Sequence, residues 1–88
     1  MDYFLFTYPN CAKCEKIKEF LGASGLEWKE YDLLQKESRM KIREFLSFLK
    51  RDVKGSVIIP TLIITQDGEV QEVLNDREEL EHWLKSRE

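Results

Sequence analysis

The stretch that decides the fold lies near the start of the chain and reads YFLFTYPNCAKC, from Tyr3 to Cys14. Its first five residues are aromatic or apolar except for one threonine, which is typical of a strand buried on both faces. Residues 8–10 interrupt that strand, and a helix is expected to follow with Asn10 as its N-cap. The stretch therefore predicts a strand that turns directly into a helix bearing two cysteines.

The cysteine-bearing helix is expected to run from Cys11 to about Leu21 and to end at Gly22 or Gly25. Ile42, Phe45, Leu46, Leu49 and Val53 recur at helical spacing further along, and Asp67-Gly68 is a strong hairpin signal. The other expected elements are a strand over Leu26–Leu33, a helix over Ser38–Val53 stopped by Gly55, a strand over Thr61–Thr65, a return strand over Glu69–Leu74 and a helix from Asn75 or Asp76, where Asp76 and Glu79 can form a capping box.

This order is strand, helix, strand, helix, strand, strand, helix. A strand–helix–strand unit implies a parallel pair with a right-handed crossover, whereas the hairpin adds antiparallel strands. The natural closure is an α/β fold with a mixed four-stranded sheet flanked by three helices, which is the thioredoxin-fold topology. With 88 residues, we expect a single domain over 1–88.

Composition excludes several classes of function. The net charge is −3 and lysines alternate with glutamates, so the sequence indicates no nucleic-acid partner. No apolar run is long enough to span a bilayer, and the first residues do not resemble a signal peptide. We therefore expect a cytoplasmic monomer that does not associate with membranes.

The two cysteines, Cys11 and Cys14, indicate a chemical role rather than a stabilising cross-link, because a disulfide between them closes almost no loop. A thiolate attacks disulfides, and the start of a helix favours an anion. Lys13 and Lys16 add positive charge near Cys11, although Glu15 partly offsets it. Cys14 should face inward with Ile17. This asymmetry predicts that Cys11 attacks and that Cys14 resolves the mixed disulfide.

The two cysteines also allow two other interpretations. They could be half of a zinc site, but the sequence has no other cysteine and one histidine, and a structural zinc site needs four ligands. They could also be buried structural thiols, since cysteine is often a core residue. We expect no metal site and no cofactor.

The chain resembles the glutaredoxins over essentially its whole length. The resemblance rests on residues 8–14 after a first strand, and on Ile58-Ile59-Pro60-Thr61 before a hairpin and a short last helix. It implies that Pro60 is a cis proline facing the cysteine pair, with the backbone of Ile59 open to a substrate chain. Tyr8 beside the site could pack against substrate. Asp76 matches an acidic residue of the family, with N-capping as its alternative role.

The resemblance implies a dithiol oxidoreductase that reduces protein disulfides, with a thiol reductase or a low-molecular thiol as electron source. Two alternatives from other classes stay open at this point. One is a module that binds a metal or an iron–sulfur cluster through Cys11, as some glutaredoxin relatives do. The other is a redox-inactive interaction protein on the same fold.

Overall fold

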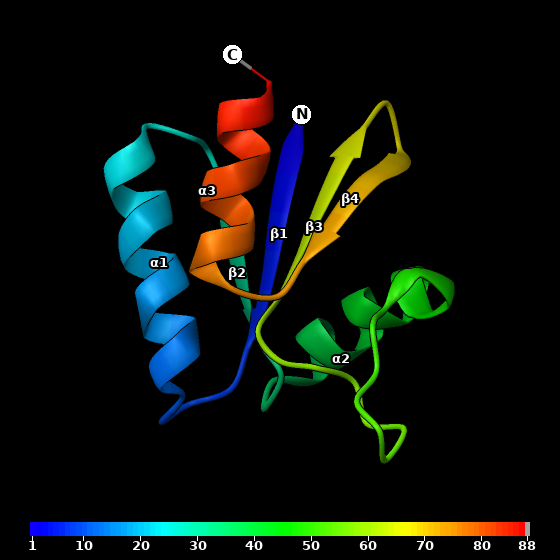
Figure 1. The fold of residues 1–88 in the computed structure, drawn as a ribbon. Helices are drawn as coiled ribbons and strands as arrows, with labels where there is room; N and C mark the ends of the chain where they lie inside the picture. Colours follow the sequence, from blue (N-terminus) through cyan, green and yellow to red (C-terminus); the bar gives the residue numbers. More distant parts are fainter. Residues whose placement is uncertain (88) are drawn as a thin grey trace.

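The computed structural model describes residues 1–87, and its elements follow the expected order (Figure 1). They are β1 (Asp2–Thr7), α1 (Ala12–Ser24), β2 (Lys29–Asp32), α2 (Lys36–Ile42), a 3-10 helix η1 (Arg43–Phe48), β3 (Thr61–Gln66), β4 (Glu69–Leu74) and α3 (Arg77–Ser86). None of the helices in this part of the chain has the length and apolar character needed to cross a membrane.

The four strands form one mixed sheet in the order β2-β1-β3-β4. β1 pairs in parallel with β2 and antiparallel with β3, where Phe6 stands opposite Thr61. β3 and β4 form the expected hairpin, and its turn residues Asp67 and Gly68 have φ values of 54° and 81°. The predicted mixed sheet of thioredoxin-like topology is therefore confirmed.

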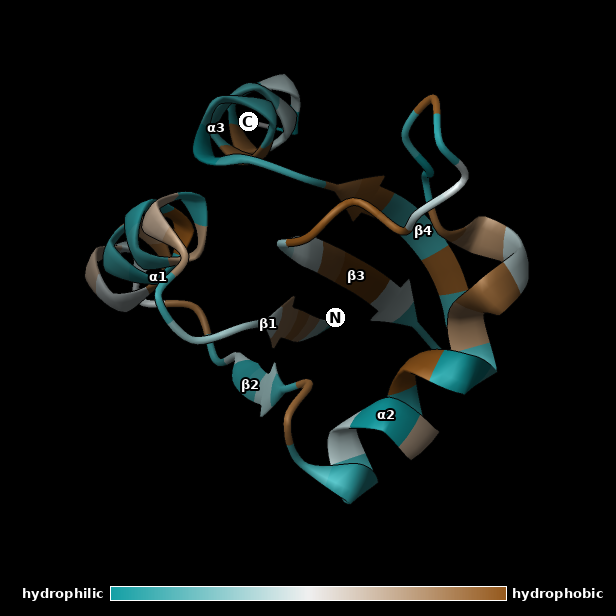
Figure 2. Ribbon diagram, turned by 90° about the horizontal axis from the view of Figure 1, so that it is seen from below, coloured by the Kyte–Doolittle hydropathy of each residue, from teal (hydrophilic) through white to brown (hydrophobic). Residues whose placement is uncertain are grey.

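The sheet is covered on both faces, as Figure 2 shows: α1 and α3 lie over one face, and α2 with η1 lies over the other. Successive residues of β1 point to opposite faces, so Leu5 packs under α1 and α3 while Phe6 packs under η1. Both side chains are fully buried. This two-sided burial explains why β1 is apolar along nearly its whole length.

The prediction of one continuous helix over Ser38–Val53 is wrong. The α-helix ends at Ile42, η1 continues to Phe48, and Leu49 has extended backbone with ψ 137°. The side chain of Asp52 accepts hydrogen bonds from two backbone N–H groups, those of Lys54 at 2.8 Å and Ser56 at 3.1 Å. This local turn competes with helix, since aspartate offers the backbone an alternative set of bonds. Residues 49–60 therefore form an extended loop.

Smaller corrections concern element ends. Cys11, not Asn10, is the N-cap of α1, and Asn10 instead has φ 56°. The helix continues through Gly22 and stops at Gly25, whose φ of 80° is easily adopted by glycine. β2 covers Lys29–Asp32 and is thus shorter than the strand predicted over Leu26–Leu33.

Candidate active site

The cysteine pair lies at the edge of the sheet where β1 ends, α1 begins and β3 begins (Figure 1). Residues 8–10 connect β1 to Cys11, and the positive φ of Asn10 turns the chain into the helix. Because β1 is fixed between β2 and β3, this short connection holds Cys11 close to the start of β3. The edge therefore brings together residues separated by about half of the chain.

Cys11 and Cys14 form a disulfide, with their Cα atoms 5.2 Å apart. Cys11 is partly exposed, whereas Cys14 is 1% exposed and lies on the buried side of α1 with Ile17. The backbone N–H of Cys14 donates to Sγ of Cys11 at 3.1 Å. The Cys11 sulfur thus occupies the N-cap position, where unpaired N–H groups favour an anion.

Lys18 of α1 forms ion pairs with two carboxylates. Nζ of Lys18 lies 2.9 Å from the Glu15 carboxylate and 3.3 Å from that of Glu30, which also accepts a hydrogen bond from buried Thr7 at 2.8 Å. The hydrogen bond to Glu15 is the main cause that raises the pKa of Lys18 above its ordinary value. Because Glu15 is paired with Lys18, its charge offsets Lys13 less than the sequence suggests.

Asp76 serves as the N-cap of α3, where its carboxylate accepts from the N–H of Glu79 at 2.8 Å. The Glu79 carboxylate accepts a hydrogen bond of 2.7 Å from the backbone N–H of Asn75. In a standard capping box the donor would be the N–H of the N-cap residue, which here is Asp76. Asp76 also lines a small cavity of about 120 Å³ together with Lys13 and Lys16 of α1. Asp76 therefore caps α3, and its carboxylate lies near the two lysines of α1.

The Ile59–Pro60 bond is cis, as the resemblance implied, and Pro60 is buried directly before β3. Extending the register of β1 and β3 by one residue places Pro60 opposite Thr7 at the end of β1. Within residues 1–87, neither the N–H nor the C=O of Ile59 has a hydrogen-bond partner. Ile59 therefore presents both of its backbone polar groups unpaired next to the cysteine-bearing edge.

Asn75 is a site residue that the sequence does not directly reveal, because its position favours only the start of a helix. Its side-chain amide donates to the carbonyls of Ile58 at 3.1 Å and Pro60 at 3.0 Å, and to Oγ1 of Thr61 at 3.2 Å. Asn75 is 8% exposed, and its buried Oδ1 has no hydrogen-bond partner among residues 1–87. One signal existed: a polar residue directly after the apolar pair Val73-Leu74 at a strand end is placed to turn inward.

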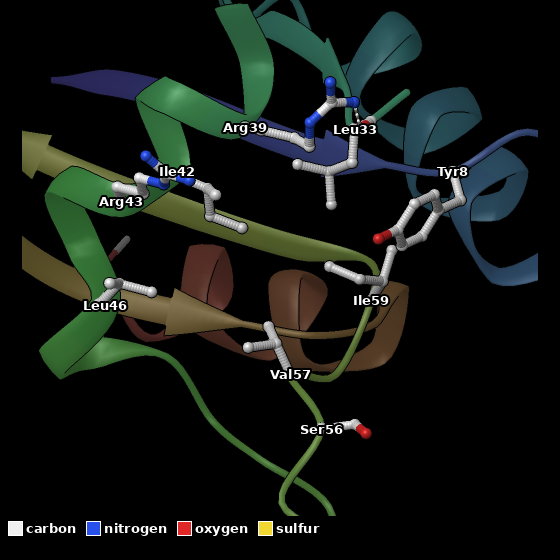
Figure 3. Close-up of a pocket in the computed structure, with 9 residues that line it drawn as sticks. All are labelled: Tyr8, Leu33, Arg39, Ile42, Arg43, Leu46, Ser56, Val57 and Ile59. Carbon is white, nitrogen blue, oxygen red and sulfur yellow. Dashed lines mark hydrogen bonds between the residues drawn. The ribbon is translucent and has the colours of Figure 1, made fainter. Parts of the chain in front are cut away.

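Tyr8 and Ile59 line a cavity beside this edge, with a volume of about 570 Å³. Figure 3 shows the Tyr8 ring lying next to Ile59 at one end of the cavity, with side chains of α2 and η1 at the other. Tyr8 is 48% exposed. The other lining residues are Leu33, Arg39, Ile42, Arg43, Leu46, Ser56 and Val57.

The comparisons with solved structures agree with this fold. Two solved structures, those of the thioredoxin-like protein BC3987 and of a point mutant of it, match with TM-scores of 0.60 and 0.61. Their sequence identities to this chain are 23% and 24%, and each match covers 93% of this chain and 97% of the other. No curated protein matches the sequence.

The architecture and the cysteine pair together define a protein of the thioredoxin fold. The Glutaredoxin family model matches residues 4–70, which is most of the chain. The chain therefore belongs to the glutaredoxin family, and its Cys11–Cys14 pair has the spacing that fits a thiol–disulfide oxidoreductase.

Proposed function

We propose that the protein reduces disulfides of other proteins through the Cys11–Cys14 dithiol, with Cys11 as nucleophile and Cys14 as resolving thiol. The observation that carries this proposal is the contact between the Cys11 sulfur and the Cys14 N–H, combined with the difference in burial between the two sulfurs. A sulfur at a helix start is stabilised as a thiolate, and partial exposure lets it reach a substrate.

The proposed reaction conserves electrons and protons. The Cys11 thiolate attacks one sulfur of the substrate disulfide, forms a mixed disulfide and releases the other sulfur as a thiolate, which takes a proton from water. The Cys14 thiol loses its proton to solvent and attacks the Cys11 sulfur. This second step releases the substrate's remaining thiolate and leaves the Cys11–Cys14 disulfide, so two electrons have passed to the substrate.

The substrate chain is proposed to pair with the backbone of Ile59. Both polar groups of this residue are unpaired within residues 1–87, and an extended peptide could bond to them as an added strand does. Tyr8 supplies an exposed aromatic face next to Ile59. Asp76 supplies a carboxylate at the small cavity that it lines with Lys13 and Lys16 of α1. The electron source is proposed to be a thiol reductase or a low-molecular thiol.

The rate of alkylation against pH tests the assignment of roles. We expect reduced protein to show one fast-reacting thiol with a pKa below the value of about 8.5 for a free thiol. Cys11→Ser should abolish the fast reaction, and Cys14→Ser should keep it while trapping a mixed disulfide with substrate. Loss of the fast reaction in Cys14→Ser alone would reverse the roles.

Turnover of a protein disulfide tests the activity itself. Reduction should proceed with thioredoxin reductase or with glutathione and glutathione reductase, and the faster system identifies the electron source. If neither system supports turnover while the fold is intact by circular dichroism, the chain is not an oxidoreductase.

A further inference from the structure

Most of the exposed large apolar side chains come from one segment of the chain. Within residues 1–87, large hydrophobic side chains at least two-fifths exposed occur at seven positions, and five of these lie between residues 34 and 53. They are Leu34, Met40, Leu46, Phe48 and Val53. Single exposed hydrophobic residues are ordinary, but a concentration on one layer of the fold indicates an interaction surface. That layer consists of the turn before α2, α2 itself, η1 and the loop that follows.

Charge is concentrated on the same layer. Residues 36–54 contain seven basic and three acidic residues, a net charge of +4, although the whole chain carries −3. The remaining residues therefore carry −7. We refer to residues 34–54 as the basic-apolar face. Such a separation of charge steers a partner of opposite sign to one side of a protein.

Arg43 is the cation of this face that is most available to a partner at the cavity. Arg39 already donates to the carbonyls of Leu33 and Leu34 at 3.0 and 2.8 Å, and Lys41 is 3.2 Å from Glu44. The guanidinium of Arg43, by contrast, has no hydrogen bond or ion pair within residues 1–87. Its side chain borders the 570 Å³ cavity, as Figure 3 shows.

The cavity joins the basic-apolar face to the cysteine-bearing edge. Leu46 and Arg43 lie at the end formed by α2 and η1, and Tyr8 and Ile59 lie at the other end (Figure 3). Tyr8 belongs to the short connection that leads from β1 to Cys11. A polypeptide that pairs with Ile59 would therefore continue across this cavity towards Arg43. An occupant that fits has an apolar side chain for the cavity and a carboxylate for the arginine.

We propose that the basic-apolar face docks an acidic segment of the substrate protein, adjacent in sequence to the cysteine that Cys11 attacks and containing an apolar residue that enters the cavity. This inference rests on the proposed function and specifies its substrate class. A protein segment is favoured over an anionic membrane because the cavity leads to the redox site, and because the −7 on the rest of the chain disfavours a negatively charged bilayer.

Three substrates separate docking from chemistry. Two peptides with the same intramolecular disulfide carry Glu-Leu-Glu or Lys-Leu-Lys beside one cysteine, and hydroxyethyl disulfide is the uncharged small substrate. We expect kcat/KM to be about tenfold or more higher for the acidic peptide at low salt, and to converge with that of the basic peptide as salt increases. Arg43→Glu should remove this preference and leave reduction of hydroxyethyl disulfide unchanged.

Lys85→Glu is the matched control, because it makes the same charge reversal on α3, which covers the opposite face of the sheet. It should keep the preference for the acidic peptide. Leu46→Ser should lower kcat/KM for both peptides but not for hydroxyethyl disulfide. Equal kcat/KM for the two peptides with wild-type protein would overturn the docking proposal.

Binding provides a readout that does not depend on turnover. Fluorescence anisotropy of a labelled acidic peptide with serine in place of cysteine should show binding that Arg43→Glu weakens and Lys85→Glu retains. Such binding together with no reduction of hydroxyethyl disulfide would reject the oxidoreductase function but support the acidic docking surface. Arg43-dependent binding to phosphatidylserine vesicles, with no binding of the acidic peptide, would overturn the proposal in favour of a membrane surface.

Discussion

The side-chain amide of Asn75 donates a hydrogen bond of 3.0 Å to the backbone carbonyl of Pro60. The same amide bonds to the carbonyl of Ile58, so the segment around the cis peptide bond is held from both sides by one residue at the end of β4. Ile59 stands between these two carbonyls, and its own N–H and C=O are unpaired in the part of the chain that the structure describes. The junction of β4 and α3 thereby fixes the orientation of the segment that we propose pairs with substrate.

Replacing Asn75 by alanine should lower the free energy of unfolding by about 1–3 kcal/mol, since the buried carbonyl of Pro60 loses its side-chain donor. We also expect a larger fall in kcat/KM for a peptide disulfide than for hydroxyethyl disulfide, because the small substrate does not need the Ile59 backbone. Denaturant unfolding and the two assays measure these effects.

Ser86→Ala is the control for Asn75→Ala, because it removes one exposed side-chain bond to the carbonyl of His82 and should change little. An Asn75→Ala variant that reduces peptide and small disulfides with equal losses would show that Asn75 has only a structural role.

Asp76 allows its capping role to be separated from substrate binding. Asp76→Ala should destabilise the protein by about 1 kcal/mol, because the N–H of Glu79 loses its acceptor. Asp76→Ser keeps a capping oxygen and should stay close to wild type in thermal unfolding. If Asp76 binds substrate, the serine variant must nevertheless reduce peptide disulfides more slowly. Wild-type turnover in that variant would limit Asp76 to capping.

Truncation to alanine should cost much more stability at Phe45 than at its neighbour Leu46. Phe45 is 7% exposed and packs against Phe4 and Phe6, so Phe45→Ala should cost about 3–5 kcal/mol of stability. Leu46 is 49% exposed, and Leu46→Ala should change stability by no more than about 0.5 kcal/mol. Urea unfolding measures both variants. Similar losses in the two would show that η1 packs in a different register from the one described.

Alkaline pH should destabilise the fold through Tyr3. Burial raises the pKa of this phenol above its ordinary value, and the positive charge of Arg87 opposes the effect only in part. The unfolded chain therefore loses the phenol proton first as pH rises through about 10, so stability falls from there until the folded state also ionises. Unfolding of the oxidised protein between pH 8 and 11 should show a shallower decline for Tyr3→Phe. Parallel pH profiles for the two proteins would contradict this prediction.

The sequence predicted those parts of the molecule whose signals are local. A continuous apolar run was enough to predict β1, turn chemistry was enough for the hairpin at Asp67-Gly68, and helical spacing was enough for the inward face of α1. The cysteine spacing was enough for the redox pair. The helix over Ser38–Val53 failed because apolar spacing cannot show that Asp52 will close a turn with the backbone of residues 54 and 56.

The hydrogen bonds of Asn75 could not be predicted from the sequence for a related reason. Its amide bonds to carbonyls 15 and 17 residues earlier in the chain, and such pairing depends on how β3 and β4 are placed in the sheet. The concentration of exposed apolar and basic residues on one layer likewise depends on the placement of α2 and η1 over a common face of the sheet.

The direction of the first strand and the last helix has a practical consequence. β1 runs towards the cysteine pair from Asp2, and α3 runs away from the same edge to Ser86, so the start of β1 and the end of α3 both lie opposite the redox site (Figure 1). Ten helical residues span about 15 Å, which is enough to keep an attached group clear of Cys11. The protein can therefore be anchored to a bead or an electrode through either end while its reactive sulfur still faces the solution.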